Sequence, residues 1–228
     1  MNYVALLFSV LIGFVFVIFI QPKTKTIQLF LSFSGAYLLS ITVLHLIPEV
    51  YESDQKNIGV FILLGILLQT VLEYFSKGAE HGHIHTHDFA KKIPWLLFIS
   101  LSLHAFLEGL PLGLEKNNHL LWAIVIHKIP ITVVLIVFLQ KSNLPKALIY
   151  IFVAIFALMS PLGNLLSNKM IFLINYQTEI SALIIGIFLH ISTAILFESS
   201  QNHKFNFFKF IAIIIGFLVA FLTAQGHF

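Results

Sequence analysis

The sequence contains no cysteine and no arginine, and charged residues make up only 10% of it. Without cysteine, neither a disulfide framework nor a thiolate metal site can form. The basic residues are 13 lysines scattered along the chain, so the isoelectric point of about 9.1 does not reflect a patch that would bind nucleic acid. Apolar side chains account for 58% of the residues, and this composition indicates an integral membrane protein.

Long apolar runs divide the 228 residues into eight segments. Each is long enough to cross a bilayer as a helix, which takes about 17–25 mostly apolar residues. The first run lacks a basic stretch before it and a small-residue cleavage site after it, so we expect a retained transmembrane helix and not a signal peptide. The sequence therefore predicts an all-α integral membrane protein with eight transmembrane helices, at 3–20, 28–50, 57–75, 94–114, 119–140, 145–166, 180–199 and 207–225.

The lysines are distributed unevenly between the loops on the two sides of these helices. With the N-terminus outside, nine lysines fall in the inner loops and three in the outer loops. Such a bias is typical of membrane proteins, whose cytoplasmic loops are the more basic. We therefore expect both termini outside and the long connection at 76–92 in the cytoplasm.

Two of the predicted spans resemble each other weakly. LHLIPEVYES (44–53) in the second span and LHISTAILFES (189–199) in the seventh differ by one inserted residue, and the two helices would run in opposite directions. Inverted repeats are common in transporters, so an inverted repeat around the fourth and fifth helices is one explanation. A chance match between two leucine-rich helices is the other.

Ionisable residues lie near the bilayer midplane in the fourth and fifth spans, where each costs about 2.5–3.5 kcal/mol or more. His104 and Glu108 are four residues apart and therefore share one face of the fourth helix, while His127 lies at a similar depth in the fifth. A single histidine of this kind often only bonds to a neighbouring helix. Two imidazoles and a carboxylate that converge favour a site for a divalent metal such as zinc, whose affinity should fall as the pH drops.

Three further polar residues within the spans are weaker candidates. His190 lies near the midplane of the seventh span, where it is a fourth ligand, a partner of a ligand, or a structural hydrogen-bonding group. His45 and Glu49 are again four residues apart, near the outer end of the second span. They form either an entrance site for the metal or simply a hydrated helix end.

The connection at 76–92 contains the run EHGHIHTHD, in which every second residue is a histidine. Alternating histidines on a flexible segment chelate Zn²⁺, Ni²⁺ or Cu²⁺ with little selectivity. We interpret this loop as a cytoplasmic collector or sensor of metal outside the transport route, with a plain solvated linker as the alternative. The four histidines are His81, His83, His85 and His87.

Three short motifs are similar to those of a known family. HAFLEG (104–109) and HKIP (127–130) resemble the HNxxEG-like and HxIPE-like motifs in the fourth and fifth helices of the ZIP family of divalent metal transporters, and LHLIPE (44–49) resembles the family's HLLPE. Eight spans, outside termini and a histidine-rich loop between spans three and four complete the likeness. The resemblance implies a single transmembrane transport domain, 1–228, that carries a divalent cation toward the cytoplasm by alternating access.

Members of the family often have two adjacent metal sites. This sequence departs from the family's motifs at positions that would supply ligands to the second site. Ala105, Lys128 and Ile131 stand where further ligands are expected. The resemblance therefore implies a site for one ion, in which the ammonium group of Lys128 supplies the charge of the missing second metal. The alternative for Lys128 is that its long side chain reaches toward water or pairs with a nearby acid.

The resemblance also bounds the protein's partners and chemistry. It implies a multi-pass protein of the cell membrane that is not an enzyme and that transports zinc or another divalent ion as substrate and not as cofactor. Its other partners are membrane lipid and, as one option, a second copy of itself in a homodimer. An intramembrane zinc-dependent hydrolase and a metal sensor that does not transport are the rival functions. The sequence contains no HExxH zinc-hydrolase motif and no GxxxxGK[ST] motif for ATP.

Overall fold

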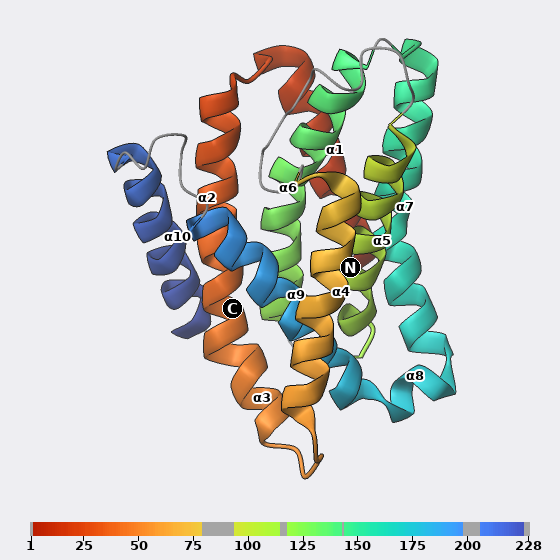
Figure 1. Ribbon diagram of the computed structural model, residues 1–228, viewed down its shortest axis with the longest axis vertical. Coiled ribbons are helices and arrows are strands. Elements are labelled where there is room, and N and C mark those ends of the chain that lie inside the picture. Colours follow the sequence, from red (N-terminus) through yellow and green to blue (C-terminus); the bar gives the residue numbers. More distant parts are fainter. Residues whose placement is uncertain (1, 79–93, 115–117, 143, 198–205, 226–228) are drawn as a thin grey trace.

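The computed structural model describes residues 2–78, 94–114, 118–142, 144–197 and 206–225 (Figure 1). These residues form helices and no strand, which confirms the predicted all-α class. The helices are α1 (Asn2–Ile20), α2 (Thr24–Ile41), the π-helical turn η1 (Thr42–Leu46), α3 (Ile47–Tyr51), α4 (Ile58–Ser76), α5 (Trp95–Leu112), α6 (Asn118–Lys141), α7 (Lys146–Lys169), α8 (Ile171–Asn175), α9 (Gln177–Phe197) and α10 (Phe207–Gln225).

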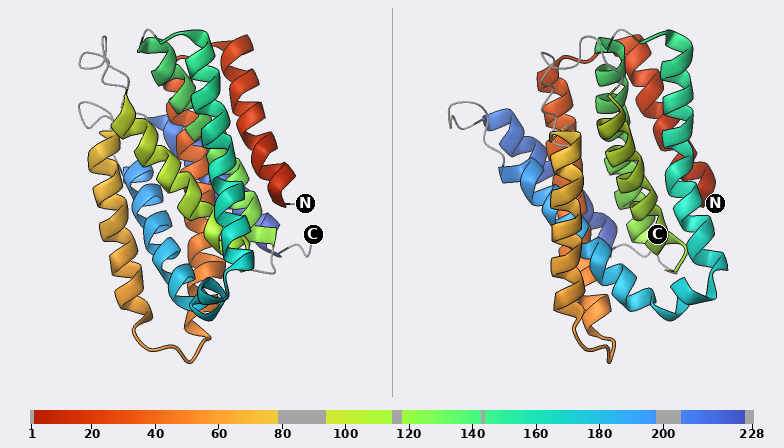
Figure 2. Two further views of the ribbon diagram at one scale, coloured as in Figure 1. Left: turned by 90° about the vertical axis from the view of Figure 1, so that its right-hand side faces the viewer. Right: turned by 45° about the vertical axis from the view of Figure 1, so that its right-hand side comes forward.

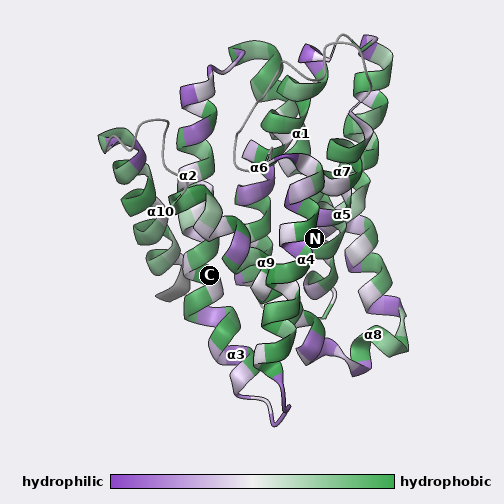
Figure 3. Cartoon of the chain, viewed as in Figure 1, coloured by the Kyte–Doolittle hydropathy of each residue, from purple (hydrophilic) through white to green (hydrophobic). Residues whose placement is uncertain are grey.

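Among the described residues, seven helices are long and apolar enough to cross a membrane. The second of them is the continuous segment Thr24–Tyr51, which joins α2, η1 and α3. A shorter apolar helix, Phe207–Thr223, lies within α10, so the count of eight spans stays a prediction. Figure 3 shows that the long helices are mostly hydrophobic, with hydrophilic residues concentrated in the turns and at isolated points along the helices. Large exposed apolar side chains such as those of Leu63 and Leu67 suit contact with lipid.

The helices pack as two groups that lie side by side (Figures 1 and 2). One group consists of α1, α5, α6 and α7, and the other of α2, α4, α9 and α10. The groups meet where α2 contacts α6 and where α5 contacts α4 and α9. Helices α5 and α6, which the sequence predicts to hold the metal, therefore belong to one group and face the other.

Close approach of α5 and α7 depends on two glycines. A Cβ atom on Gly109 would overlap the backbone of Ser160, and one on Gly163 would overlap the carbonyl of Phe106. Small residues let the backbones of membrane helices come together where lipid gives no hydrophobic driving force. The glycines therefore fix the position of α7 against the part of α5 that carries Glu108.

The π-helical turn η1 interrupts the second span just before Pro48. The N–H group of Ile47 bonds to the carbonyl of Thr42, five residues back. Proline has no N–H group and its ring crowds the carbonyl four residues earlier, so the wider turn accommodates it. The turn contains His45 and sets the direction of the polar helix end that follows.

The contacts between helices match the pattern that an inverted repeat would produce. Such a repeat would relate α1, α2 and α4 to α7, α9 and α10, and α5 to α6. The contact between α2 and α10 would then correspond to that between α9 and α4, and the contact between α1 and α6 to that between α7 and α5. All four pairs are in contact, and α2 and α9 run in opposite directions in Figure 1. The repeat stays a prediction that this pattern supports.

Candidate metal centre

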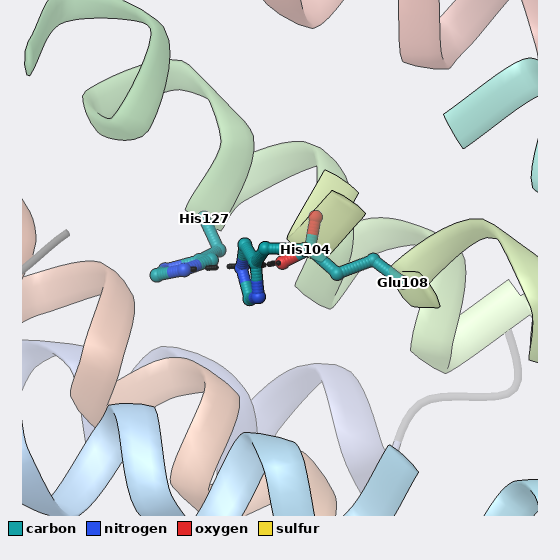
Figure 4. Close-up of side chains that lie close together, drawn as sticks. All are labelled: His104, Glu108 and His127. Carbon is teal, nitrogen blue, oxygen red and sulfur yellow. Dashed lines mark ion pairs between the residues drawn. The ribbon is translucent and has the colours of Figure 1, made fainter. Parts of the chain in front are cut away.

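The structure brings together the three residues that the sequence predicts as metal ligands (Figure 4). His104 Nε2 lies 2.9 Å from Glu108 Oε1, one turn along α5. His127 Nε2, from the antiparallel neighbour α6, lies 3.9 Å from the same carboxylate oxygen. One candidate ligand atom from each residue lies within 4.8 Å of the others, so a small inward shift would let all three coordinate a single ion.

These three side chains are buried inside the bundle. His104 and Glu108 are 2% exposed and His127 is 0% exposed. His104 Nδ1 makes no hydrogen bond within the described part of the chain, whereas His104 Nε2 and Glu108 Oε1 face each other as a pair. Two imidazoles and a carboxylate are thus held close together away from water, as a group that could hold a metal ion. A divalent metal with nitrogen and oxygen ligands at about 2.0–2.2 Å fits this donor set.

Lys128 places its ammonium group beside the same carboxylate. Its Nζ lies 3.9 Å from Glu108 Oε2 and donates a hydrogen bond of 2.6 Å to Ser160 Oγ on α7. Ser160 in turn donates to the carbonyl of Ala105 on α5. The side chain is 1% exposed, and the ammonium group lies 4.6 Å from the centre of the Phe156 ring. Lys128 is thus held inside the bundle next to an acid, and does not reach out to water.

Two serines contact residues of the centre, although nothing in the sequence marked them as candidates. Ser160 links Lys128 to α5, as described above. Ser34 of α2 places its Oγ 3.5 Å from His127 Nδ1, so this contact crosses between the two helix groups. A partner at Nδ1 favours presentation of the other ring nitrogen, Nε2, to the centre. Serines are common in these helices, and only the three-dimensional contacts distinguish these two.

His190 does not join the centre in this structure. Its Nε2 lies 2.5 Å from Glu73 Oε2, in a pair that bridges α9 and α4, and the two side chains are 20% and 29% exposed. The structure therefore places the candidate fourth ligand with a different acid, and Glu73 is the partner that the sequence did not identify.

The remaining candidates lie at the ends of the helices. His45 and Glu49 line a common pocket at the end of the bundle that carries α3, and the ring of His45 stacks on that of His119. His119 was not among the residues that the sequence singled out. The loop histidines 81, 83, 85 and 87 lie outside the described residues.

Long apolar helices around a buried centre of histidine and glutamate define an integral membrane protein with a site suited to a metal ion. Comparison with known families identifies the family of this membrane protein. The family model described as "ZIP Zinc transporter" matches residues 76–224, which include α5 and α6. The chain belongs to the ZIP family, and with its apolar helices it is a multi-pass membrane protein.

Individual relatives match over shorter stretches. The chain is 38% identical over 88 residues to "Zinc transporter ZIP1" of Danio rerio and 39% identical over 88 residues to the protein of the same name from Takifugu rubripes. These matches cover 37% and 36% of this chain and 29% of each relative. "Protein zntD" of Dictyostelium discoideum is 28% identical over 163 residues, which is 62% of this chain and 24% of that protein. The chain thus matches less than a third of the length of each of these relatives.

Proposed function

We propose that this protein transports a divalent metal cation, zinc in the first place, through the centre formed by His104, Glu108 and His127. The observation that carries the proposal is the convergence of two imidazoles and one carboxylate from α5 and α6, all buried inside the bundle. Membership of a family of zinc transporters and the name of the ZIP1 relatives support the same substrate. Histidine with carboxylate also accepts Fe²⁺, Mn²⁺, Co²⁺ and Cd²⁺, so selectivity must be measured.

The ammonium group of Lys128 adapts the centre to a single ion that must leave again. Without metal, its positive charge offsets the negative charge of the Glu108 carboxylate, 3.9 Å away. With metal bound, the ammonium group and the divalent ion repel each other, which weakens binding and promotes release. The resemblance of HKIP to the family's motif also puts Lys128 where related proteins are expected to carry a ligand for a second metal. We therefore propose that Lys128 substitutes for that metal and limits the centre to one ion.

The burial of the centre supports transport by alternating access. The ligands are at most 2% exposed, so an ion there is separated from the water on both sides. Two pockets at the α3 end share Leu46, Glu49 and Leu120, and the inner one reaches Pro111, one turn beyond Glu108 in α5. This end is the outer one if the lysine bias sets the orientation, so the direction of transport would be toward the cytoplasm.

The hydrolase and sensor alternatives have less support. A zinc hydrolase needs a general base beside an open coordination position, yet Glu108 is the one acid in the metal cluster of the described residues and is used as a ligand. A sensor would bind metal without moving it. Zinc flux into vesicles therefore separates both alternatives from a transporter.

The test replaces each ligand separately in the full chain. In proteoliposomes that contain a zinc-sensitive dye, His104→Ala, Glu108→Ala and His127→Ala should each reduce zinc influx to the level of empty vesicles. Ser9→Ala is a matched control, because Ser9 is equally buried but donates its hydrogen bond to the carbonyl of Leu6 within α1. Normal influx with any two of the ligand variants would eliminate the proposed centre.

A further inference from the structure

A pocket of about 410 Å³ opens at the α3 end of the bundle, away from the metal centre. It is lined by two imidazoles and two carboxylates, from His45, Glu49, Glu52 and His119. His45 belongs to the π-helical turn η1, the two glutamates follow it, and His119 comes from the first turn of α6. Segments more than 60 residues apart in the sequence therefore bring four metal-binding side chains to one cavity.

The two histidines are in direct contact. Their ring centroids lie 4.7 Å apart and their planes differ by 3°, so the rings stack face to face. His45 Nε2 is buried and makes no hydrogen bond within the described residues. A buried imidazole nitrogen without a partner is costly unless a ligand binds to it. The unbonded nitrogen of His45 is therefore evidence for a ligand-binding site that does not depend on the nearby carboxylates.

We propose that His45 and His119, together with a carboxylate of Glu49 or Glu52, bind a divalent transition metal ion at the mouth of the protein. Parallel rings do not yet coordinate a common ion, because their lone pairs do not converge. Rotation of one ring about its Cβ–Cγ bond into the pocket brings a nitrogen from each toward a common point. Two imidazoles, one carboxylate and a water molecule then complete a four-coordinate zinc site.

The position of this second site suggests how an ion leaves it. Glu49 lines both this pocket and the inner pocket of about 170 Å³, which extends to Pro111. A carboxylate exposed to both cavities can release an ion from one and attract it into the other. The exposed ligands Glu49 and Glu52 also keep the site open to water, which favours rapid exchange. The role of recruiting ions for transport rests on the proposed function, whereas the binding itself does not.

Binding is tested in a full chain whose other metal sites are removed. In this background, His104, Glu108 and His127 are replaced by alanine, and the loop histidines 81, 83, 85 and 87 by serine. Isothermal titration with Zn²⁺ alone should then detect one remaining ion per chain. If removal of an outer-shell partner costs roughly 10–100-fold in metal affinity, removal of a ligand by His45→Ala or His119→Ala should weaken binding by at least about tenfold.

Asp54→Asn provides the matched control for charge, because Asp54 lies in the same turn region but lines neither pocket. It should leave the affinity unchanged. Absence of the remaining ion, or binding that survives both histidine substitutions, would overturn the proposal. Each variant is checked for a monodisperse elution profile and unchanged helicity, so that loss of binding is not attributed to unfolding.

Recruitment is tested separately by influx through the intact centre. His45→Ala/His119→Ala should raise the zinc concentration for half-maximal influx several-fold and leave the maximal rate unchanged. A lowered maximal rate with an unchanged half-maximal concentration would contradict a recruiting role. If instead the core ligand variants still transport zinc, the proposed function fails, while the titration result for the outer site stands.

Discussion

At the residue scale, the charge of Lys128 makes the sharpest prediction about the centre. Lys128→Met keeps the long side chain and removes the charge next to Glu108. Loss of the repulsion between an ammonium group and a divalent ion should strengthen zinc binding by more than about tenfold. Two unit charges 4 Å apart interact by about 4 kcal/mol at an effective dielectric of 20, and a tenfold change in affinity takes only about 1.4 kcal/mol. Release should become slower, and the maximal influx rate should fall.

Isothermal titration and influx measure the two consequences of that substitution. Lys128→Arg retains the charge and is the control, with an affinity close to that of the wild type. An unchanged or weaker affinity in Lys128→Met would mean that the ammonium group does not act on the bound ion.

The number of ions per chain gives a second prediction at this scale. With the loop histidines replaced by serine and His45 and His119 by alanine, the full chain should bind one zinc ion, because Ala105, Lys128 and Ile131 leave no second set of ligands. Inductively coupled plasma mass spectrometry of the purified protein after dialysis gives the ratio directly. A ratio of two would refute the single-ion centre.

At the element scale, the contact between α5 and α7 depends on glycine. Gly109→Ala should lower the free energy of unfolding by about 1–3 kcal/mol, because the added methyl group meets the backbone of Ser160. Gly59→Ala is the matched control in α4, where a Cβ atom would meet only the hydroxyl of Tyr51 at 3.8 Å. Thermal unfolding in detergent compares the two, and equal melting temperatures for both variants would contradict the account.

The sequence predicted those elements and residues whose signal is local. The i, i+4 spacing of His104 and Glu108 identified half of the centre, and the run of apolar residues located the helices to within a few residues. Contacts between distant segments leave no such signal. The pairing of His119 with His45, and of Ser160 with Lys128, depends on which helices become neighbours. For the same reason the sequence located His190 in a predicted span but did not place it beside Glu73.

At the scale of the whole molecule, the orientation in the membrane can be measured because the chain has no cysteine of its own. Asp54→Cys should react with a membrane-impermeant maleimide added to intact cells, since residue 54 lies at the α3 end. Lys146→Cys, at the opposite end, should react only after the membrane is permeabilised. The reverse pattern of labelling would place the loop at 76–92 outside and invert the proposed direction of transport.

The histidine-rich loop gives the last prediction for the molecule as a whole. Replacing histidines 81, 83, 85 and 87 by serine should leave zinc influx largely intact and remove weak metal binding on the cytoplasmic side. Replacing Lys91 and Lys92 by serine in the same loop is the control for altered charge. Complete loss of influx in the histidine variant would mean that the loop forms part of the transport route.

The central claim is that the transported ion binds between α5 and α6, and anomalous X-ray scattering at the zinc edge tests it most directly. Crystals of the full chain soaked in zinc should give one anomalous peak within the membrane-spanning bundle, bound by His104, Glu108 and His127, and Glu108→Ala crystals should lack it. Zinc found elsewhere in the bundle, with no peak among these three side chains, would contradict the account.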